Sequence, residues 1–356
     1  MTFAAFLQHL AFALGLALLS AAAVRTMIAF PILDHPNGRS SHARPTPRAG
    51  GVGVVLAFVA GMCALYLTAR YARVAEPEFL GVIAAAVAIG LIGLVDDLKS
   101  LPASLRLAAQ AGAALVAVGS GLVVSQLWVP WFGVLELGLL GPALTVVWIM
   151  GCTNAVNFMD GLDGLVGGTM LVAAAALALV AAMQEGWFVY AAALFLAAGL
   201  LGFLPFNLHP ARIFMGDVGS QFAGFGIAVL AVAASRFDGQ QVSFLIVPLL
   251  LFGLLFDAAF TLLRRACMGE RLAEAHRTHL YQMAQRSGLG VRTVAAVHWG
   301  FALFHAALAL LFLELHPDTK PLVVVPVLAV QLGWLGYVAW RVRRAGLSWR
   351  SPPVQS

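Results

Sequence analysis

The sequence predicts an all-α integral membrane protein, and three observations on composition, apolar stretches and charge placement support this. Hydrophobic residues make up 61% of the 356 residues, and charged residues only 10%. Soluble domains carry about 25% charged residues, so a chain this apolar belongs in a lipid bilayer. Stretches of about 20 apolar residues, the length that crosses the bilayer core, recur along the chain. The charged residues gather between these stretches.

Eleven apolar stretches are predicted to form a polytopic bundle of about 11 transmembrane helices. The first has no basic segment before it and no convincing cleavage site, so we interpret it as a retained helix rather than a signal peptide. No repeat, long linker or low-complexity segment divides the chain, so we expect one domain over residues 1–356. The predicted helices cover roughly residues 4–24, 50–69, 79–95, 104–123, 141–158, 164–183, 187–205, 214–234, 243–263, 294–314 and 321–340.

Two features between and within these helices are simple to interpret. The segment 124–140 combines Trp, Pro and Gly with partial alternation, which predicts an interfacial hairpin or a re-entrant piece. The three cysteines lack the spacing of a metal knuckle or a disulfide framework, so we interpret them as packing residues. They are Cys63, Cys152 and Cys267.

Lysine and arginine gather in alternate loops, which predicts the orientation of the protein in its membrane. One set of loops, together with Arg25 and Arg106 at the adjoining helix ends, holds 17 of the 21 basic residues; it covers roughly 31–49, 96–103, 159–163, 206–213, 264–293 and the tail from Arg341. The positive-inside rule places these loops in the cytoplasm, the N-terminus outside and the C-terminus inside. The net charge of +5 therefore reflects orientation, and we expect no nucleic-acid partner.

Five polar motifs interrupt the apolar pattern, and all five fall on the predicted cytoplasmic side. Polar groups beside a membrane are costly, so such a cluster indicates a functional site facing the cytoplasm. The motifs are "DHPNGRSSHARPTPRAGG" (34–51), "GLVDDLKS" (93–100), "NAVNFMDGLDGLVGG" (154–168), "FNLHPARIFMGDVGS" (206–220) and "EAHRTHLYQ" (274–282).

Aspartates dominate these motifs. Asp96 and Asp97 end a predicted helix, where acids oppose the helix dipole and repel each other unless Lys99 or a divalent metal ion neutralises them. Asn157, Asp160 and Asp163 recur every three residues and would share one face of a helix or tight turn.

Two further sites in these motifs leave alternatives open. Asp217 follows Gly216 near a helix N-terminus, where it could serve as an N-cap or lie beside a bound phosphate. His276 and His279 flank Arg277, and a zinc site would need further ligands that the sequence does not show. A solvated amphipathic helix and a phosphate- or sugar-contacting pair both remain as interpretations of the histidines. Carboxylates combined with Arg, Lys and His suit Mg²⁺-assisted phosphoryl transfer at a membrane surface.

The motifs resemble those of the polyprenyl-phosphate N-acetylhexosamine-1-phosphate transferases, from about Asp34 to Gln282. "PTPRAGG", "GLVDD", "NAVNFMDGLDGL", "FNLHPARIFMGDVGS" and "HRTH" occur in the family's order. The resemblance implies that a UDP-N-acetylaminosugar and undecaprenyl phosphate react at the cytoplasmic face, giving undecaprenyl-pyrophosphoryl-sugar and UMP. "HRTH" replaces the run of histidines of the peptidoglycan translocases, so the chain is more similar to the branch that initiates O-antigen synthesis.

The resemblance also implies a role for each motif residue. Asp217 would be the principal ligand of Mg²⁺, with Mn²⁺ as an alternative, and Asp96 would deprotonate or orient the lipid phosphate. Phe214 and Asp163 would form the uridine pocket, although core packing is the simpler reading of Phe214 alone. The catalytic set is Asp96, Asp97 and Asp160, and the substrate-binding set is Asn157, Asp163, Asn207, Phe214, His276, Arg277 and His279.

Three other functions are alternatives to this one. A secondary transporter would place its site near the bilayer midplane, often on internal repeats, whereas these polar clusters sit at one set of helix ends. The CDP-alcohol phosphotransferases carry aspartates at another spacing, with an adjacent Ala-Arg that "DGLDGL" lacks. A peptidoglycan-type phospho-sugar translocase remains as an alternative, and a homodimer is an open expectation.

Overall fold

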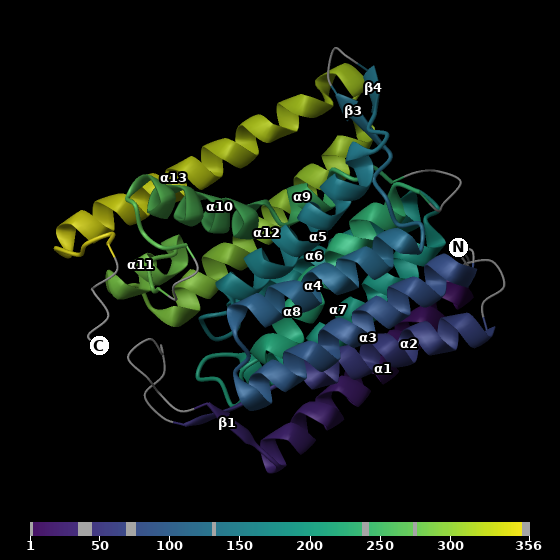
Figure 1. Ribbon diagram of the computed structural model, residues 1–356, viewed down its shortest axis with the longest axis horizontal. Coiled ribbons are helices and arrows are strands. Elements are labelled where there is room, and N and C mark those ends of the chain that lie inside the picture. The colour runs from purple at the N-terminus through teal and green to yellow at the C-terminus, as the bar shows by residue number, and fades with distance from the viewer. Residues whose placement is uncertain are drawn as a thin grey trace.

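The computed structural model describes residues 3–34, 45–68, 76–129, 133–236, 242–272 and 276–350, apart from the side chains of 76–78 and 128–129. The fold is an all-α membrane bundle (Figure 1). Nine helices among the described residues are long and apolar enough to cross a bilayer, one of them counted together with the short helix η1 (Pro317–Val323) that precedes it. They are α1 (Phe3–Ala29), α2 (Gly51–Thr68), α3 (Glu76–Lys99), α5 (Leu140–Met159), α6 (Leu165–Met183), α7 (Trp187–Asn207), α8 (Gly216–Ala234), α12 (Val291–Glu314) and α13 (Val324–Arg344).

Helix α8 is the centre of the bundle. Within its apolar window 94% of residues are buried, against 28% in α1 and α12. Glycines let its neighbours approach closely: a Cβ on Gly93 of α3 would lie 2.6 Å from the Cα of Val218, and one on Gly51 of α2 would lie 2.1 Å from the Cα of Gly219. These contacts fix the first turn of α8 against the end of α3 and the start of α2.

Two predicted spans differ from the structure. Residues 243–263 do not form one helix, because Leu251 (φ −93°, ψ 4°) separates the short α9 (Ile246–Leu250) from α10 (Phe252–Cys267). The stretch 104–123 yields only the 17-residue α4 (Ala103–Gly119), because the chain turns at Gly121 with φ +100°.

Short hairpins lie at the two ends of the bundle (Figure 1). β3 (Gln126–Val129) and β4 (Gly133–Glu136) pair antiparallel, which confirms the predicted hairpin between the fourth and fifth helices. β1 (Ile32–Asp34) and β2 (Thr46–Arg48) form a second hairpin that the sequence did not predict. Their connection, with His35 and His42, lies outside the described residues.

The last feature that positions the polar motifs is α11 (Leu280–Arg286), a short helix inside the loop predicted over 264–293. It packs against α13, where Arg341 donates to the hydroxyl (3.2 Å) and carbonyl (2.8 Å) of Ser287. These bonds fix the C-terminal end of α11 against α13.

Candidate active site

The ends of α3 and α8 meet through Asp97, which is 1% exposed. Its two carboxylate oxygens accept the backbone N–H groups of Asp217 (3.0 Å) and Val218 (3.1 Å). These groups have no partner within α8, so Asp97 caps α8 from another helix. The sequence reading of Asp217 as an N-cap is therefore wrong, because Met215 holds that position and Asp217 lies inside the first turn. Gly216 (φ +74°) leaves room, since a Cβ there would lie 2.5 Å from Asp97 Oδ2.

With its N–H engaged, Asp217 presents its carboxylate to two other helices. Asn157 of α5 donates from Nδ2 to Asp217 Oδ1 (2.5 Å) and to the Ser220 hydroxyl (2.9 Å). Asp217 Oδ2 lies 3.9 Å from a guanidinium nitrogen of Arg106, and Asp96 Oδ2 lies 3.2 Å from the same nitrogen. Two carboxylates from different helices thus share one cation.

Arg106 of α4 was missed by the sequence reading. It is the only charged residue in "ASLRLAAQAGAALVAVG", and it stands in the first turn, where a cation opposes the helix dipole. That unfavourable placement was the signal that could have identified it. The Arg106 side chain is 35% exposed and Asp217 is 24% exposed, whereas Asp96 is only 3% exposed. The site therefore opens to solvent through Arg106 and Asp217.

Asp160 adds a further carboxylate as the C-cap of α5. Burial, followed by the nearby charges of Asp217, Asp97 and Asp163, raises the pKa of Asp160 from 3.8 to about 8. Carboxylates gathered at such density stabilise a bound cation, and perturbed groups of this kind are typical of functional sites.

The "PTPRAGG" motif holds the segment that leads into Asp217 through backbone hydrogen bonds. Phe214 N–H donates to the carbonyl of Pro47 (2.8 Å), and the N–H groups of Gly50 and Gly51 donate to the carbonyls of Phe214 and Met215 (both 2.9 Å). These bonds hold Phe214, half-buried, directly before the turn that carries Asp217. The "PTPRAGG" motif therefore positions the "FNLHPARIFMGDVGS" motif just before Asp217.

Asp163 and Asn207 join the loop after α5 to the loop after α7. One oxygen of Asp163 accepts from His209 Nδ1 (2.7 Å) and from the N–H of Ala211 (3.1 Å). Asn207, 3% exposed, accepts from Gly164 N–H (3.0 Å) and donates to the carbonyl of Ile213 (3.0 Å). In this structure Asn207 acts as a clamp between loops, and its predicted contact with substrate stays a prediction.

Two side chains of helix α12 bind the loops after α5 and α7, and the sequence reading missed both of them. Arg292 donates twice to the carbonyl of His209 (3.2 and 3.0 Å), and Trp299 Nε1 donates to the carbonyl of Gly164 (3.0 Å). A Cβ on Gly168 would lie 2.1 Å from Trp299 Nε1, so glycine is needed for the indole to approach.

The histidine motif is anchored by Asp257 of α10, which is 2% exposed. Its oxygens accept from His279 Nδ1 (3.1 Å) and from the N–H groups of Leu280 (2.9 Å) and Tyr281 (3.0 Å) at the start of α11. Since His279 is 3% exposed, the reading of this segment as a solvated amphipathic helix is wrong.

The same motif lies against the helix that carries Asn157. Tyr281 OH donates to the carbonyl of Phe158 (3.1 Å), and the ring of His279 stacks on that of His276 with centroids 4.9 Å apart. Arg264 donates to the hydroxyl of Thr278 (2.8 Å) and fixes the turn between the two histidines. Arg277 lies in this same turn, and its carbonyl accepts from Arg286 (3.1 Å).

A chain of side-chain amides accounts for Asn154 of "NAVN", an asparagine in an otherwise apolar helix. Asn154 donates to Gln110 Oε1 (2.6 Å), and Gln110 Nε2 donates to Gln221 Oε1 (3.0 Å). Each amide has a partner from another helix, so this network locks α4, α5 and α8 behind the carboxylates.

The carboxylates of Asp96 and Asp217 fit a hard divalent cation that also binds phosphate oxygens of a substrate. No group of three or more His, Cys, Asp or Glu that could hold a metal occurs within the described residues. Mg²⁺ is usually bound through one or two carboxylates, with phosphate oxygens and water completing its shell. Asp96 and Asp217 match that requirement, because both carboxylates point at a single positive charge.

Comparison with known proteins decides the family. A family model described as glycosyl transferase family 4 matches residues 79–235, which span α3 to α8. The probable undecaprenyl-phosphate N-acetylglucosaminyl 1-phosphate transferase of Bacillus subtilis (strain 168) is 31% identical over 292 residues, covering 80% of this chain and 79% of that protein. The chain belongs to this family, the polyprenyl-phosphate N-acetylhexosamine-1-phosphate transferases.

Other relatives carry related names. The decaprenyl-phosphate N-acetylglucosaminephosphotransferase of Mycobacterium tuberculosis (strain ATCC 25618 / H37Rv) is 31% identical over 78% of this chain and 76% of its own length. A phospho-N-acetylmuramoyl-pentapeptide-transferase of Lactobacillus gasseri is 32% identical over 54% of this chain and 62% of its own length. The family resemblance is thus confirmed, and the protein is a phospho-sugar transferase.

Proposed function

We propose that this transferase moves an N-acetylaminosugar 1-phosphate from a UDP-sugar to undecaprenyl phosphate, giving undecaprenyl-pyrophosphoryl-sugar and UMP. The observation that carries the proposal is the pair Asp96 and Asp217, brought from two helices onto the guanidinium of Arg106 at one end of the bundle. Both substrates carry phosphates, and the cluster offers carboxylates for a cation and a cation for phosphate oxygens.

In the proposed reaction the lipid phosphate attacks the β-phosphorus of the UDP-sugar. The bond from that phosphorus to the bridging oxygen breaks, and UMP leaves with the bond's electron pair. One anhydride is broken and one is formed, so no ATP is consumed. Asp96, buried and held by Leu101 N–H (2.6 Å) and Arg106, has a fixed orientation from which to receive or orient the acceptor phosphate.

Mg²⁺ is the proposed cofactor, and Asp217 with Asp96 would hold it together with phosphate oxygens of the donor. When bound, the ion would neutralise charge that develops on the transferred phosphoryl group. Arg106 would bind a further phosphate oxygen from the same side. Asn157 fixes Asp217 Oδ1, so the carboxylate is oriented before the substrate arrives.

The nucleotide would lie between Phe214 and Asp163. Phe214 is half-buried and directly precedes the turn that carries Asp217, and its ring would stack on uracil. Within the part of the chain that the structure describes, Asp163 receives its two bonds on one oxygen, Oδ2, so Oδ1 would accept the imide N–H of uracil. Cytosine has no N–H at that position, so this contact would favour uridine nucleotides.

The relatives that cover most of the chain guide the choice of sugar. Their names specify N-acetylglucosamine, whereas the relatives named for the muramoyl pentapeptide align with only 54% of it. We therefore favour UDP-N-acetylglucosamine as donor, and initiation of O-antigen or another cell-envelope glycan as the pathway step. The charge asymmetry of the loops supports an inner-membrane protein with a cytoplasmic site, N-terminus outside.

The experiment is an assay of UMP release by purified protein. UMP should appear only when a polyprenyl phosphate and Mg²⁺ are both present, and fastest with UDP-N-acetylglucosamine among a panel of UDP-sugars. Release without the lipid would indicate a hydrolase. Uptake of UDP-sugar into vesicles without UMP would indicate a transporter.

A further inference from the structure

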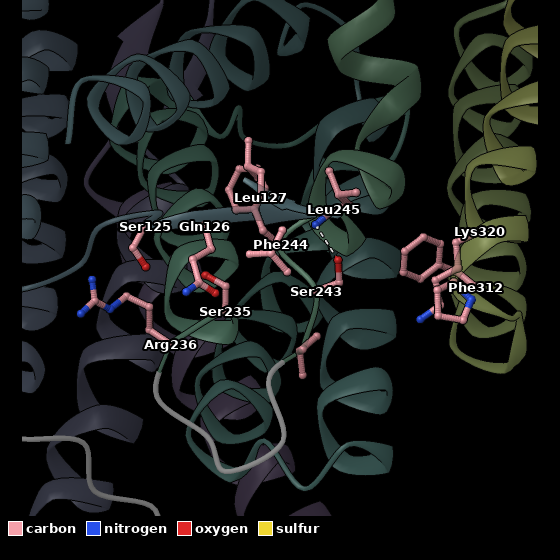
Figure 2. Close-up of a pocket in the computed structure, with 13 residues that line it drawn as sticks. Ser125, Gln126, Leu127, Ser235, Arg236, Ser243, Phe244, Leu245, Phe312 and Lys320 are labelled. Carbon is pink, nitrogen blue, oxygen red and sulfur yellow. Dashed lines mark hydrogen bonds between the residues drawn. The ribbon is translucent and has the colours of Figure 1, made fainter. Parts of the chain in front are cut away.

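A cavity of about 460 Å³ lies at the end of the bundle opposite the carboxylates (Figure 2). Asp217 stands in the first turn of α8 and Ser235 follows its last, so the two places are about 27 Å apart at 1.5 Å per residue. The described residues of its wall belong to the β3–β4 hairpin, to the two ends of the α8–α9 connection (Ser235 and Arg236, and residues 242–245), to the end of α12 and to η1. None of the residues proposed for catalysis lines it.

The lining is amphipathic. Figure 2 shows Arg236 on one side with Ser125, Gln126 and Ser235, and Lys320 with Phe312 on the other. Apolar side chains lie between them and reach the outside of the bundle, since Leu245 is 41% exposed and Val134 is 59% exposed. A ligand that combines anionic oxygens with an apolar part would match this surface.

The two cations of the cavity have donors to spare. Arg236 donates from one guanidinium nitrogen to the carbonyl of Val123 (3.1 Å), and Lys320 Nζ lies 4.9 Å from the centre of the Phe312 ring. Neither has an ion-pair partner among the residues that the structure describes. A guanidinium has five N–H donors and an ammonium three, so oxygens of an anion can still be bound.

Two acids of the surrounding segments already have partners. Glu136 of β4 accepts from Gln126 Nε2 (2.7 Å), and Asp318 of η1 pairs with His316 (3.3 Å). The cations are also unusual, because only four of the 21 Lys and Arg fall on this side in the predicted topology. Two of these four line one cavity, which favours an anionic ligand.

We propose that this cavity binds the phosphodiester headgroup of an anionic phospholipid in the leaflet opposite the candidate active site. The cavity lies where α8 and α12 end, which is the depth at which lipid headgroups meet a membrane protein. Arg236, beside the serine hydroxyls, would bind the phosphate, and Lys320 on the other side would attract the anionic headgroup through its charge. The exposed Leu245 and Val134 would contact the acyl chains. The proposal is independent of the transferase reaction.

The test is lipid binding by purified protein in detergent, followed by native mass spectrometry and thermal unfolding with added phosphatidylglycerol or phosphatidylcholine. Phosphatidylglycerol should bind and raise the unfolding temperature more than phosphatidylcholine. The double variant R236Q/K320Q should weaken phosphatidylglycerol binding by about fivefold for each charge removed, from about 1 kcal/mol per cation. The charge-retaining control R236K/K320R should bind within about twofold of the native protein.

Three outcomes would overturn the proposal. One is equal binding of the two lipids by the native protein. Another is unchanged phosphatidylglycerol binding by R236Q/K320Q, which would place the lipid elsewhere. The third is full competition by millimolar inorganic phosphate, which would show a soluble-anion site instead of a lipid site. If R236Q/K320Q misfolds, the single variants Arg236→Gln and Lys320→Gln, each compared with its charge-retaining counterpart, decide the question.

Discussion

One buried aspartate and a cluster of aspartates show how the same residue type serves two purposes in one bundle. Asp257 is bound by four donors, including Thr261 Oγ1 (3.2 Å), His279 and two backbone N–H groups. Asp96 and Asp217 instead share a single guanidinium, and Asp160 beside them has a pKa raised to about 8. The carboxylate of Asp257 is saturated, whereas the cluster near Asp217 holds more negative charge than its partners neutralise.

This difference distinguishes a structural carboxylate, Asp257, from the carboxylates of the candidate active site. A saturated carboxylate stabilises the fold and has little capacity left for a ligand. An under-neutralised cluster costs folding energy and recovers it when a cation and phosphates bind. Variants of the two groups should therefore have opposite effects on activity and stability.

Asp217→Asn should show the largest effect on activity. The amide keeps an oxygen for Asn157 but loses the charge that a hard cation needs, so we expect kcat to fall about a thousandfold. The unfolding temperature should stay level or rise, because repulsion within the cluster is relieved. Steady-state UMP release and thermal unfolding of the same preparation check this. Wild-type activity at low Mg²⁺ would remove Asp217 from the metal site.

Arg106→Gln should show the second-largest loss of activity. Without the guanidinium the transferred phosphate loses a charged donor, so kcat should fall about a hundredfold. Because Arg106 competes with a metal for Asp96 and Asp217, this variant should bind Mg²⁺ more tightly. Arg106→Lys keeps the charge and should recover part of the rate. Weaker Mg²⁺ binding in Arg106→Gln, measured by titration, would contradict the shared-cation arrangement.

Asp257→Asn should show the reverse pattern to Asp217→Asn. One amide oxygen cannot satisfy the donors that a carboxylate holds, so stability should drop by about 1–3 kcal/mol. Activity should fall less than in Asp217→Asn, through loosening of the segment around His279. Thr261→Val removes only one donor and serves as the control with a smaller loss. A stable but inactive Asp257→Asn would mean that Asp257 belongs to the site.

The raised pKa of Asp160 predicts a pH effect on the metal-free protein. In the unfolded chain Asp160 ionises near 3.8, and in the folded protein near 8, so the folded state binds more protons between these values. Stability should fall as pH rises through that window and level off above it. Thermal unfolding from pH 6 to 8 in EDTA should show the fall, and Asp160→Asn or added Mg²⁺ should reduce it. A rise of stability with pH that Asp160→Asn abolishes would contradict the sign.

Phe214→Ala should give the smallest effect. Stacking on uracil is similar in the ground and transition states, so KM for the UDP-sugar should rise while kcat changes little. Phe214→Tyr keeps the ring and should retain a near-normal KM. A loss of thermal stability with unchanged KM would instead support core packing.

Hydropathy predicted the helices because a bilayer imposes the length and apolarity of each crossing. The break at Leu251 was not predictable in this way, since the residues on both sides are equally apolar. The sequence also marked the polar motifs as one face, and the structure brings four of them together around Asp217 and Asn157.

The roles within that face depend on contacts distant in sequence. Asp97 caps α8 across 120 residues, and Asp96, its neighbour, faces Arg106 instead. Nothing local distinguishes the two acids. Asp257 binds His279, which lies 22 residues away at the start of another helix. The tertiary structure assigns these partners, and no periodicity in the sequence carries that information.

The central claim is that the carboxylate cluster transfers a sugar phosphate, not a sugar alone. Its most direct test is to give the purified protein UDP-N-acetylglucosamine radiolabelled on the β-phosphate, together with undecaprenyl phosphate and Mg²⁺. The account predicts that the label passes to the lipid in an amount equal to the UMP formed, and that Asp217→Asn abolishes the transfer. Label that stays in UDP while the lipid gains only the sugar, or transfer that persists in Asp217→Asn, would contradict it.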